Sequence, residues 1–336
     1  MKDDHFVVPD EFRGIALDEF VALRWPDVAK GALRRLIRDG AITVEGQQVS
    51  PSQTLRSGQL VLVEMGGELP KKTSRAKIKL EILFRDENLL AVNKPAGIPV
   101  EPSRWGEHPI HLTGALLEWA EGGRREDGLV AERPRALHRL DLGTSGVVLY
   151  ALNLEAERHY RGLFEARLVE KTYHALVIGE IHEGGVVDAP LEEADRGKRM
   201  QVAKRGGKPS VTEYFPTKIY RGFTMVEAKP RTGRTHQIRV HLASLGHPLM
   251  VDPLYGGRER ILLSEIKPGY RPKKGRPEKP LMERLTLHAK SVRLTGLDGK
   301  EQYIEADHPK DLRVLLSKME KWRHASQTNS KRFPGL

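Results

Sequence analysis

The most informative stretch of this sequence is His138-Arg139-Leu140-Asp141-Leu142-Gly143-Thr144-Ser145-Gly146. It lies between two apolar runs, residues 136–137 and residues 147–150. Both runs predict buried strands, so Asp141 should lie in a tight connection at a strand end. A carboxylate held there beside an arginine can serve as a nucleophile or a base. Taken alone, such an aspartate is more often a turn residue whose side chain caps its own loop.

Further motifs along the chain favour the chemical interpretation. The stretch 138–146 resembles the catalytic motif of the RluA/RluC/RluD-type pseudouridine synthases. The same family pattern continues, in order, in five other blocks: residues 89–97 (LLAVNKPAG), 170–177 (EKTYHALV), 207–214 (GKPSVTEY), 232–242 (TGRTHQIRVHL) and 287–289 (LHA). Together the blocks cover most of residues 80–310. The resemblance therefore implies a pseudouridine synthase fold.

The composition is compatible with an RNA partner. The chain of 336 residues has 56 Lys and Arg against 45 Asp and Glu, a net charge of +11, which favours polyanionic partners. It contains no cysteine, which excludes disulfides, thiolate metal sites and a cysteine nucleophile. No apolar signal stretch opens the sequence, and no run approaches the roughly 18 apolar residues of a membrane span. We expect a cytoplasmic protein that acts as a monomer.

Part of the positive charge lies in two segments that contain Gly and Pro, residues 196–208 and 267–277. Gly and Pro disfavour helices, so both segments are expected to be exposed loops. A basic run is ordinarily interpreted as a solvated loop. In a protein that binds RNA, the better interpretation is that the run contacts phosphates. The candidate phosphate contacts in these segments are Arg199, Lys204, Lys273 and Lys274.

The N-terminal part has a pattern of its own. Apolar residues of the segment 31–40 fall on one helical face and its three arginines on the opposite face, with short strands expected to follow. Over residues 12–66 the pattern resembles the ribosomal-protein S-four-type RNA-binding domain, which presents arginines to RNA phosphates. The matching arginines are Arg34, Arg35 and Arg38. The acidic residues Asp18 and Glu19 are expected to lie away from this face, and a solvated surface is the simpler alternative.

The expected domains are a small α/β RNA-binding domain at 12–66, a linker at 67–76, the catalytic domain at 77–320 and a basic C-terminal tail at 321–336. The Gly- and Lys-containing linker predicts few contacts across it. In the catalytic domain, many short apolar runs lack a regular strand–helix alternation, which favours an α+β fold with a largely antiparallel sheet. The resemblance likewise implies a central mixed sheet with flanking helices. Helical periods appear at residues 112–120, 155–166 and 237–245.

The resemblance also assigns the chemistry. Converting uridine to pseudouridine breaks the bond between base nitrogen and sugar and forms a carbon–carbon bond, which needs an ionised carboxylate but neither a metal nor a redox cofactor. Asp141 matches that carboxylate, which either attacks the anomeric carbon or takes a proton from the neighbouring sugar carbon. Desolvation under a nucleotide would protonate it, so a permanent cation is needed nearby. Arg239 matches the family arginine of this ion pair.

Other site residues follow from the same resemblance. Tyr173 matches the tyrosine that stacks on the base and is the candidate for late proton removal. Arg139 matches the arginine implicated in occupying the RNA helix when the target base is extruded. Extrusion is required because a stacked uridine shields its glycosidic bond. Without the resemblance, Tyr173 would be interpreted as a core residue and Arg239 as a surface residue. The remaining candidate substrate-binding residues are His138, Thr144, Arg234, His236, Gln237 and Lys94. Of these, His236 and Gln237 are expected to brace the arginine loop, and Lys94 to belong to a structural turn near the site.

Two function classes remain open. One is a pseudouridine synthase acting on structured RNA, with large-subunit ribosomal RNA preferred over transfer RNA; the other is a non-catalytic RNA-binding factor for ribosome assembly. The joint presence of Asp141, Tyr173 and Arg239 favours the enzyme. A metal-dependent hydrolase is disfavoured, because no acidic residue accompanies the histidines between Glu227 and Asp252.

Two departures from the family pattern stand out. Val251 precedes Asp252 where the family usually has glycine, which puts the shape of that loop in doubt. The stretch 258–283 is also longer and more basic than the family pattern, so it is a candidate for setting substrate preference.

Overall fold

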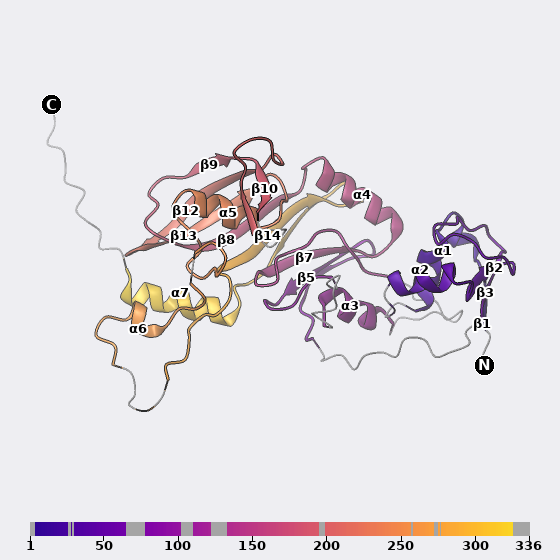
Figure 1. Ribbon diagram of the computed structural model, residues 1–336, viewed down its shortest axis with the longest axis horizontal. Helices are drawn as coiled ribbons and strands as arrows, with labels where there is room; N and C mark the ends of the chain where they lie inside the picture. The colour runs from indigo at the N-terminus through magenta and orange to yellow at the C-terminus, as the bar shows by residue number, and fades with distance from the viewer. Residues whose placement is uncertain are drawn as a thin grey trace. The chain divides into compact units, whose positions relative to one another are not determined.

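The computed structural model describes residues 4–25, 28, 30–64, 78–101, 110–121, 133–194, 199–256, 258–271, 275 and 277–324. They form two compact units (Figure 1). Unit 1 comprises Met1–Leu80, Pro99–Ala136 and Tyr150–Glu157, and unit 2 comprises Glu81–Ile98, Leu137–Leu149 and Arg158–Leu336. The expected linker at 67–76 and residues 325–336 of the expected tail lie outside the described residues.

The N-terminal part of unit 1 is a small sheet covered by helices. Its three antiparallel strands have the order β1-β3-β2. The elements are β1 (Asp4–Val7), the short 3-10 helix η1 (Asp10–Phe12), α1 (Leu17–Arg24), α2 (Lys30–Arg38), β2 (Ile42–Val44) and β3 (Leu60–Val63). Apolar side chains of these elements, including the fully buried Leu33 and Ile37, form one core. Gly40 follows α2 with a left-handed φ of 78°, a conformation that favours glycine where a helix ends.

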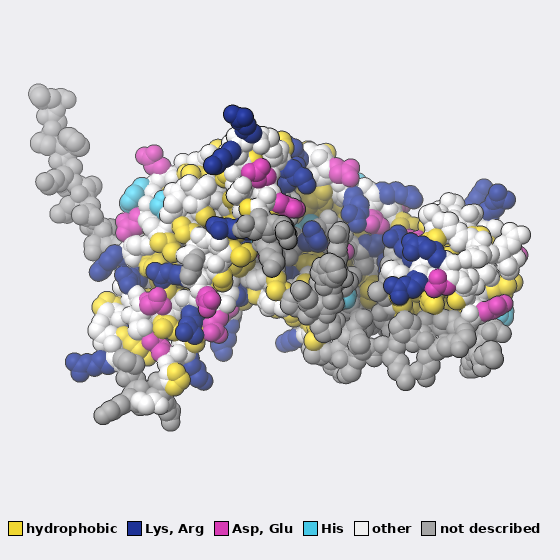
Figure 2. Space-filling model, viewed as in Figure 1, with side chains coloured by type: hydrophobic (Ala, Val, Ile, Leu, Met, Phe, Trp, Pro, Cys, Tyr) yellow, Lys and Arg dark blue, Asp and Glu magenta, His cyan; other side chains and the backbone are white. Residues whose placement is uncertain are grey.

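The arginines of α2 face solvent, opposite the buried side of the helix. Lys and Arg side chains gather over this part of the surface (Figure 2). One detail corrects the sequence-based expectation. Asp18 does not lie away from the arginines: it is buried, and its Oδ2 accepts a hydrogen bond of 2.6 Å from Arg34 Nε. Arg34 therefore carries an intramolecular ion pair, whereas Arg35 and Arg38 project from the exposed face.

Unit 1 also contains α3 (Leu112–Glu121) and β6 (Arg135–Ala136), which pairs with the last two residues of β7 (Ser145–Ala151). Ion pairs join this part of unit 1 to the N-terminal domain, where the sequence led us to expect few contacts. Glu19 of α1 accepts a hydrogen bond of 3.1 Å from Arg135 Nη2 and lies 3.7 Å from Arg133 Nη1. Arg135 also pairs with Glu157 at 3.3 Å. Because both guanidinium groups are buried, they need carboxylate partners, and α1 supplies one.

Unit 2 is organised around a mixed sheet with the order β4-β5-β7-β14-β8-β13-β12-β9, and β15 pairs with β14. The strands not yet defined are β4 (Ile82–Arg85), β5 (Leu89–Lys94), β8 (Glu170–Ile178), β9 (Gly185–Asp188), β12 (Val211–Tyr220), β13 (Phe223–Pro230), β14 (Leu287–Thr295) and β15 (Glu301–Glu305). Strands β7 and β14 pair in parallel, whereas β14 with β8, β8 with β13, and β13 with β12 are antiparallel. The predicted α+β class with a largely antiparallel sheet is confirmed.

Gly146, the last residue of the central motif, permits the parallel contact between β7 and β14. It lies opposite Ala289 and has a φ of 116°, which other residues rarely adopt. A Cβ atom there would stand 2.1 Å from the carbonyl oxygen of Ala289. Two motifs far apart in the sequence, the one ending at Gly146 and the one at 287–289, are thus packed backbone to backbone.

Helices cover both faces of the sheet in unit 2. Alternate residues of β8 point to opposite faces: Ala175 and Val177 pack against α5 (Gln237–Ser244), and Leu176 packs against α7 (Lys310–Trp322). The remaining elements are α4 (Leu154–Glu165), α6 (Leu263–Ile266) and a hairpin of β10 (Leu191–Ala194) and β11 (Arg199–Val202). No helix in the described part of the chain is long and apolar enough to cross a membrane.

Candidate active site

Asp141 lies in a tight turn immediately before β7, where the sequence predicted it. The turn is closed by a hydrogen bond of 3.0 Å from the Thr144 amide to the Asp141 carbonyl oxygen. His138 Nε2 accepts the amide hydrogen of Leu149 at 3.1 Å, which ties the start of the loop to β7. The Asp141 side chain is 24% exposed, so its carboxylate is held by the fold and still open to a ligand.

Arg239 of α5 faces this carboxylate from the other side of the site. Its Nη1 donates a hydrogen bond of 2.9 Å to Asp141 Oδ2, across 98 positions of sequence. The arginine side chain is only 5% exposed, because α5 packs against β12 and β13. The structure therefore brings together the carboxylate and the cation that the sequence paired.

Asp252 completes this group and was not among the sequence-based site residues. Arg239 Nε and Nη2 donate to its two oxygens at 2.7 and 2.9 Å, a bidentate pair, and the Asp252 side chain is fully buried. Backbone amides of Leu254 and Tyr255 also bond to it. Burial lowers the pKa of Arg239, but the charges and hydrogen bonds of the two carboxylates raise it by more than that. The pKa therefore lies above its usual value, and the guanidinium stays charged.

The loop around Asp252 forms with Val251 at the position where the family pattern usually has glycine. Val251 is fully buried in the apolar core that α7 closes, and Asp252 directly after it turns toward α5. An acidic residue straight after a buried apolar run was the available sequence signal for this partner. It could not be matched to Arg239 without knowing how the loop folds.

Tyr173 lies on β8, on the sheet face that α5 covers, and it is partly buried among apolar residues. Burial raises the pKa of its hydroxyl, and the charge of Asp141 raises it further. At neutral pH the side chain is therefore a protonated phenol. Its position near the Asp141 charge brings all three expected catalytic residues into one region of unit 2.

Gln237 and His236 brace the segment that leads into α5. Gln237 accepts from the Thr232 hydroxyl at 2.6 Å and from the Arg234 amide at 3.1 Å, and it donates to the Val211 carbonyl oxygen at 2.9 Å. His236 has a left-handed backbone with a φ of 54°, an uncommon conformation outside glycine. Its Nε2 lies 3.9 Å from Asp141 Oδ2. Gln237 thus holds the loop by hydrogen bonds, while His236 lies near the carboxylate at more than hydrogen-bond distance.

Lys94 lies beneath the catalytic loop. Its side chain is fully buried, and Nζ donates to the carbonyl oxygens of Pro95, Ile98 and Leu142 at 3.0, 2.8 and 3.3 Å. Burial lowers the pKa of Lys94 to about 7, against the opposing effect of the Asp141 charge. The lysine therefore joins the turn after β5 to the residue that follows Asp141.

The other predicted site residues have different environments. Arg139 is exposed, and within the described residues its side chain forms no ion pair. The Thr144 hydroxyl is buried and bonds to no partner among the same residues. Burial lowers the pKa of His138 to about 3, so this ring is neutral. Arg234 donates to the Pro209 carbonyl oxygen at 3.3 Å, beside the strand that Gln237 holds.

One predicted phosphate contact flanks the site. Arg199 of β11 is exposed, and its guanidinium carbon lies 5.4 Å from the ring centroid of Tyr255. Lys204, just after β11, is also exposed. Lys273 and Lys274 lie outside the described residues. The described part of the chain contains no group of three or more His, Asp or Glu side chains suited to a metal ion.

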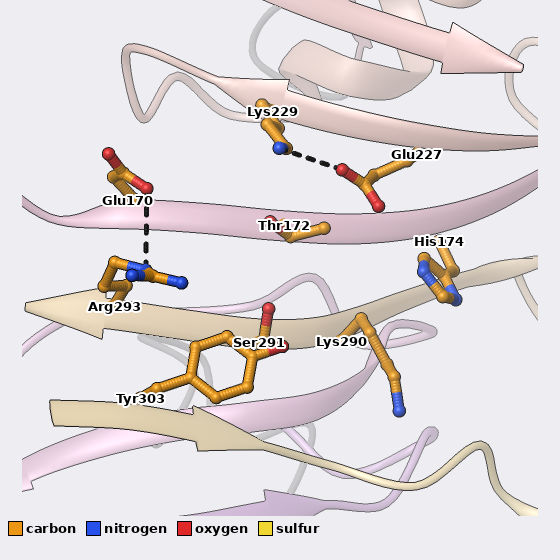
Figure 3. A pocket seen from close by; sticks show the side chains of 9 residues that line it. All are labelled: Glu170, Thr172, His174, Glu227, Lys229, Lys290, Ser291, Arg293 and Tyr303. Atoms are coloured by element: carbon orange, nitrogen blue, oxygen red, sulfur yellow. Dashed lines mark ion pairs between the residues drawn. The ribbon is translucent and has the colours of Figure 1, made fainter. Parts of the chain in front are cut away.

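A separate polar pocket of about 230 Å³ lies on the face of the sheet opposite to Tyr173, and Figure 3 shows the side chains that line it. It is lined from β8, β13, β14 and β15 by Glu170, Thr172, His174, Glu227, Lys229, Lys290, Ser291, Arg293 and Tyr303. Two ion pairs join charges that line it, Lys229 with Glu227 at 2.9 Å and Arg293 with Glu170 at 3.9 Å. Thr172 and His174 alternate with Tyr173 along β8, so this pocket is distinct from the Asp141 site.

Comparisons with known proteins agree with this geometry. The family model for RNA pseudouridylate synthases matches residues 88–244, which include Asp141, Tyr173 and Arg239. The chain is 37% identical over 256 residues to a protein named ribosomal large subunit pseudouridine synthase D from Pseudomonas aeruginosa, covering 76% of this chain and 78% of that protein. It is 33% identical over 321 residues to a protein of the same name from Xanthomonas campestris, covering 93% and 91%.

Solved structures give the same family. Human RNA pseudouridylate synthase domain containing 4 superposes with a TM-score of 0.54 at 26% identity, covering 71% of this chain and 93% of that one. Human RNA pseudouridylate synthase domain containing 1 superposes with a TM-score of 0.52 at 28% identity, covering 74% and 89%. With the match spanning the fold, the central motif and the Asp141–Arg239 pair, the chain belongs to the RNA pseudouridylate synthase family and is an RNA pseudouridine synthase.

Proposed function

We propose that this enzyme converts uridines of large-subunit ribosomal RNA to pseudouridine, with Asp141 as the reacting carboxylate. The observation that carries the proposal is the hydrogen bond of 2.9 Å between Asp141 Oδ2 and the buried Arg239. The ribosomal target rests on relatives named ribosomal large subunit pseudouridine synthase D, which span most of the chain. The enzyme is expected to act in the cytoplasm as a monomer.

In this mechanism Arg239 keeps Asp141 ionised when a nucleotide covers the site. Covering a carboxylate removes its water and favours the protonated form, and a fixed cation opposes that effect. Asp252 holds two guanidinium nitrogens of Arg239, so the third is aimed at Asp141 without freedom to rotate. Asp141 Oδ1 accepts no hydrogen bond within the described residues, and it is the oxygen we assign to the sugar. It serves either as the nucleophile or as the base.

Other residues have supporting roles in the proposal. Tyr173 stacks on the base, and its oxygen takes the last proton from the base while its own hydroxyl proton passes to water, so the phenol stays neutral. Arg139 is exposed beside Asp141 and without an ion pair in the described chain, so it can enter the space left by an extruded uridine. Arg35, Arg38, Arg199 and Lys204 are exposed cations that can contact phosphates.

The test uses total RNA from cells that lack the gene for this protein. We expect purified enzyme to introduce pseudouridine at defined positions of large-subunit ribosomal RNA, mapped by sequencing. Asp141→Asn should bind the same RNA and introduce none, because the amide is similar in size but is neither nucleophile nor base. Modification of transfer RNA alone would overturn the target. Activity of Asp141→Asn within about tenfold of wild type would overturn the role of the carboxylate.

A further inference from the structure

His236 and Tyr255 form a pair beside Asp141 whose function the proposed mechanism does not use. The left-handed backbone of His236 aims its ring between two partners. On one side Nδ1 lies 3.0 Å from the Tyr255 hydroxyl oxygen, and on the other Nε2 lies 3.9 Å from Asp141 Oδ2. The Tyr255 ring packs edge-on against His236 and lies 5.0 Å from the Arg239 guanidinium carbon. The pair thus contacts both members of the central ion pair.

The hydrogen bonds of Tyr255 fix which nitrogen of His236 carries the proton. The phenol oxygen already accepts the amide hydrogen of Met200 at 2.8 Å. Its own hydrogen then needs an acceptor, and among the described residues His236 Nδ1 is the acceptor that lies in reach. An imidazole that accepts at Nδ1 is neutral and carries its hydrogen on Nε2. That N–H points toward Asp141.

We propose that Tyr255 locks His236 in the neutral Nε2–H form and that this N–H supplies a second hydrogen bond to Asp141 Oδ2 once a nucleotide covers the site. The inference rests on the proposed role of Asp141. Because Arg239 and His236 both serve Oδ2, the negative charge is anchored on that oxygen and Oδ1 is left toward the sugar. His236 is therefore a positioning residue, and Tyr255 is its support.

The surrounding charges are compatible with a neutral His236. Burial lowers the pKa of this imidazole, the charge of Asp141 raises it and that of Arg239 lowers it. Asp252 is occupied by the bidentate bond to Arg239. Arg199 of β11 lies 5.4 Å from the Tyr255 ring centroid and Arg239 lies 5.0 Å from it, and these two cations strengthen the phenol hydroxyl as a donor. A protonated His236 would instead turn an N–H toward that hydroxyl.

The direct test is nitrogen NMR of the full-length enzyme with labelled histidine, with the His236 signals assigned by their loss in His236→Gln. We expect the neutral Nε2–H form in the wild type at pH 7. Tyr255→Phe keeps the ring beside Arg239 but removes the hydroxyl, and it should give a mixture of the two neutral forms. A wild-type ring protonated at Nδ1, alone or with Nε2, would overturn the inference. Tyr303→Phe, a change at an exposed tyrosine of β15, is the matched control and should leave the signals unchanged.

Kinetics supply the second readout. His236→Ala should lower kcat by about tenfold to a hundredfold, the worth of a hydrogen bond to a charged group, with little change in KM. His236→Gln keeps a side-chain N–H and should recover part of that loss, whereas His182→Gln, at an exposed histidine, should match the wild type. If His236→Ala turns over normally while Asp141→Asn is inactive, the inference fails and the proposed function stands. Full activity of Asp141→Asn would overturn both.

Discussion

At the scale of single residues, Arg239 carries the site because it serves two carboxylates at once. Asp252, fully buried, holds the Nε and Nη2 edge of the guanidinium, and Asp141 takes Nη1. A lysine offers a compact point charge that cannot reproduce three donors in one plane. The geometry of the arginine, and not only its charge, therefore holds the reacting carboxylate in place.

We predict that Arg239→Lys lowers turnover and that Arg239→Met lowers it further. Arg239→Met should also destabilise the fold by about 3–5 kcal/mol, because it leaves the buried Asp252 without its partner. Turnover on a ribosomal RNA fragment and urea unfolding measure the two effects. Arg258→Lys, at a partly exposed pair with Glu265, is the control and should change neither. Equal turnover of the wild type and both Arg239 variants would show that this arginine is structural only.

At the scale of elements, β14 brings a buried histidine to the strand that follows the catalytic turn. His288 Nδ1 accepts from the Ser145 hydroxyl at 2.9 Å, and Nε2 donates to the Ala306 carbonyl oxygen at 3.2 Å. Burial lowers the pKa of His288 to about 3. In the unfolded chain the pKa is about 6.5, so below that pH the unfolded state binds the proton first.

The stabilising contribution of His288 is therefore complete above about pH 6.5 and is lost as pH falls toward 3. Between pH 4 and 6 the free energy of unfolding should rise with pH by about 1.4 kcal/mol per unit from this group alone. Urea unfolding at several pH values measures this dependence. The free energy of unfolding should rise with pH less steeply in His288→Gln than in the wild type, by about 1.4 kcal/mol per pH unit. Identical slopes would mean that this ring is not held neutral in the folded protein.

The exposed arginines of α2 lead to a prediction about the salt dependence of RNA binding. Changing Arg35 and Arg38 together to Gln should lower the salt dependence of RNA binding, by about 0.7–0.9 in the logarithmic slope for each phosphate that is no longer neutralised. Because Arg34 is paired with the buried Asp18, Arg34→Gln should change the slope less and the stability more. Binding titrations at several salt concentrations compare the three proteins. If the double variant has the wild-type slope, the basic face of α2 does not touch RNA.

At the scale of the whole molecule, the N-terminal domain shares a compact unit with β6 and the start of α4. Glu19 is the carboxylate through which α1 meets the buried Arg133 and Arg135. Ion pairs from α1 therefore connect the N-terminal domain to β6 within this unit.

We predict that a protein truncated to begin at Lys77 is less stable than the full chain, because Arg133 and Arg135 lose Glu19. Glu19→Gln should reproduce part of this effect, about 1–3 kcal/mol in the free energy of unfolding, since the amide leaves a buried cation undercompensated. Asp39→Asn, at an exposed acid after α2, serves as the control and should lie within about 0.5 kcal/mol of wild type. Unchanged unfolding of the truncated protein would show that the ion pairs contribute nothing to stability.

The sequence by itself determined the features that depend on neighbouring residues. Apolar periodicity gave helices α3, α4 and α5 to within a few positions, and the tight turn at Asp141 followed from glycine and serine between two apolar runs. The exposed arginines of α2 followed from the same 3.6-residue period. The motifs, in their order, identified the family, and with it the pairing of Asp141 with Arg239.

Only the tertiary structure decided which groups meet when no local pattern joins them. Asp252 lies 13 positions beyond Arg239, and only the fold of the intervening loop turns it back to α5. Tyr255 reaches His236 through the same loop, and Asp18 reaches Arg34 because α1 packs on α2. These contacts arise because a buried charge or hydroxyl must find a partner, and the chain supplies it from whatever segment the packing brings near.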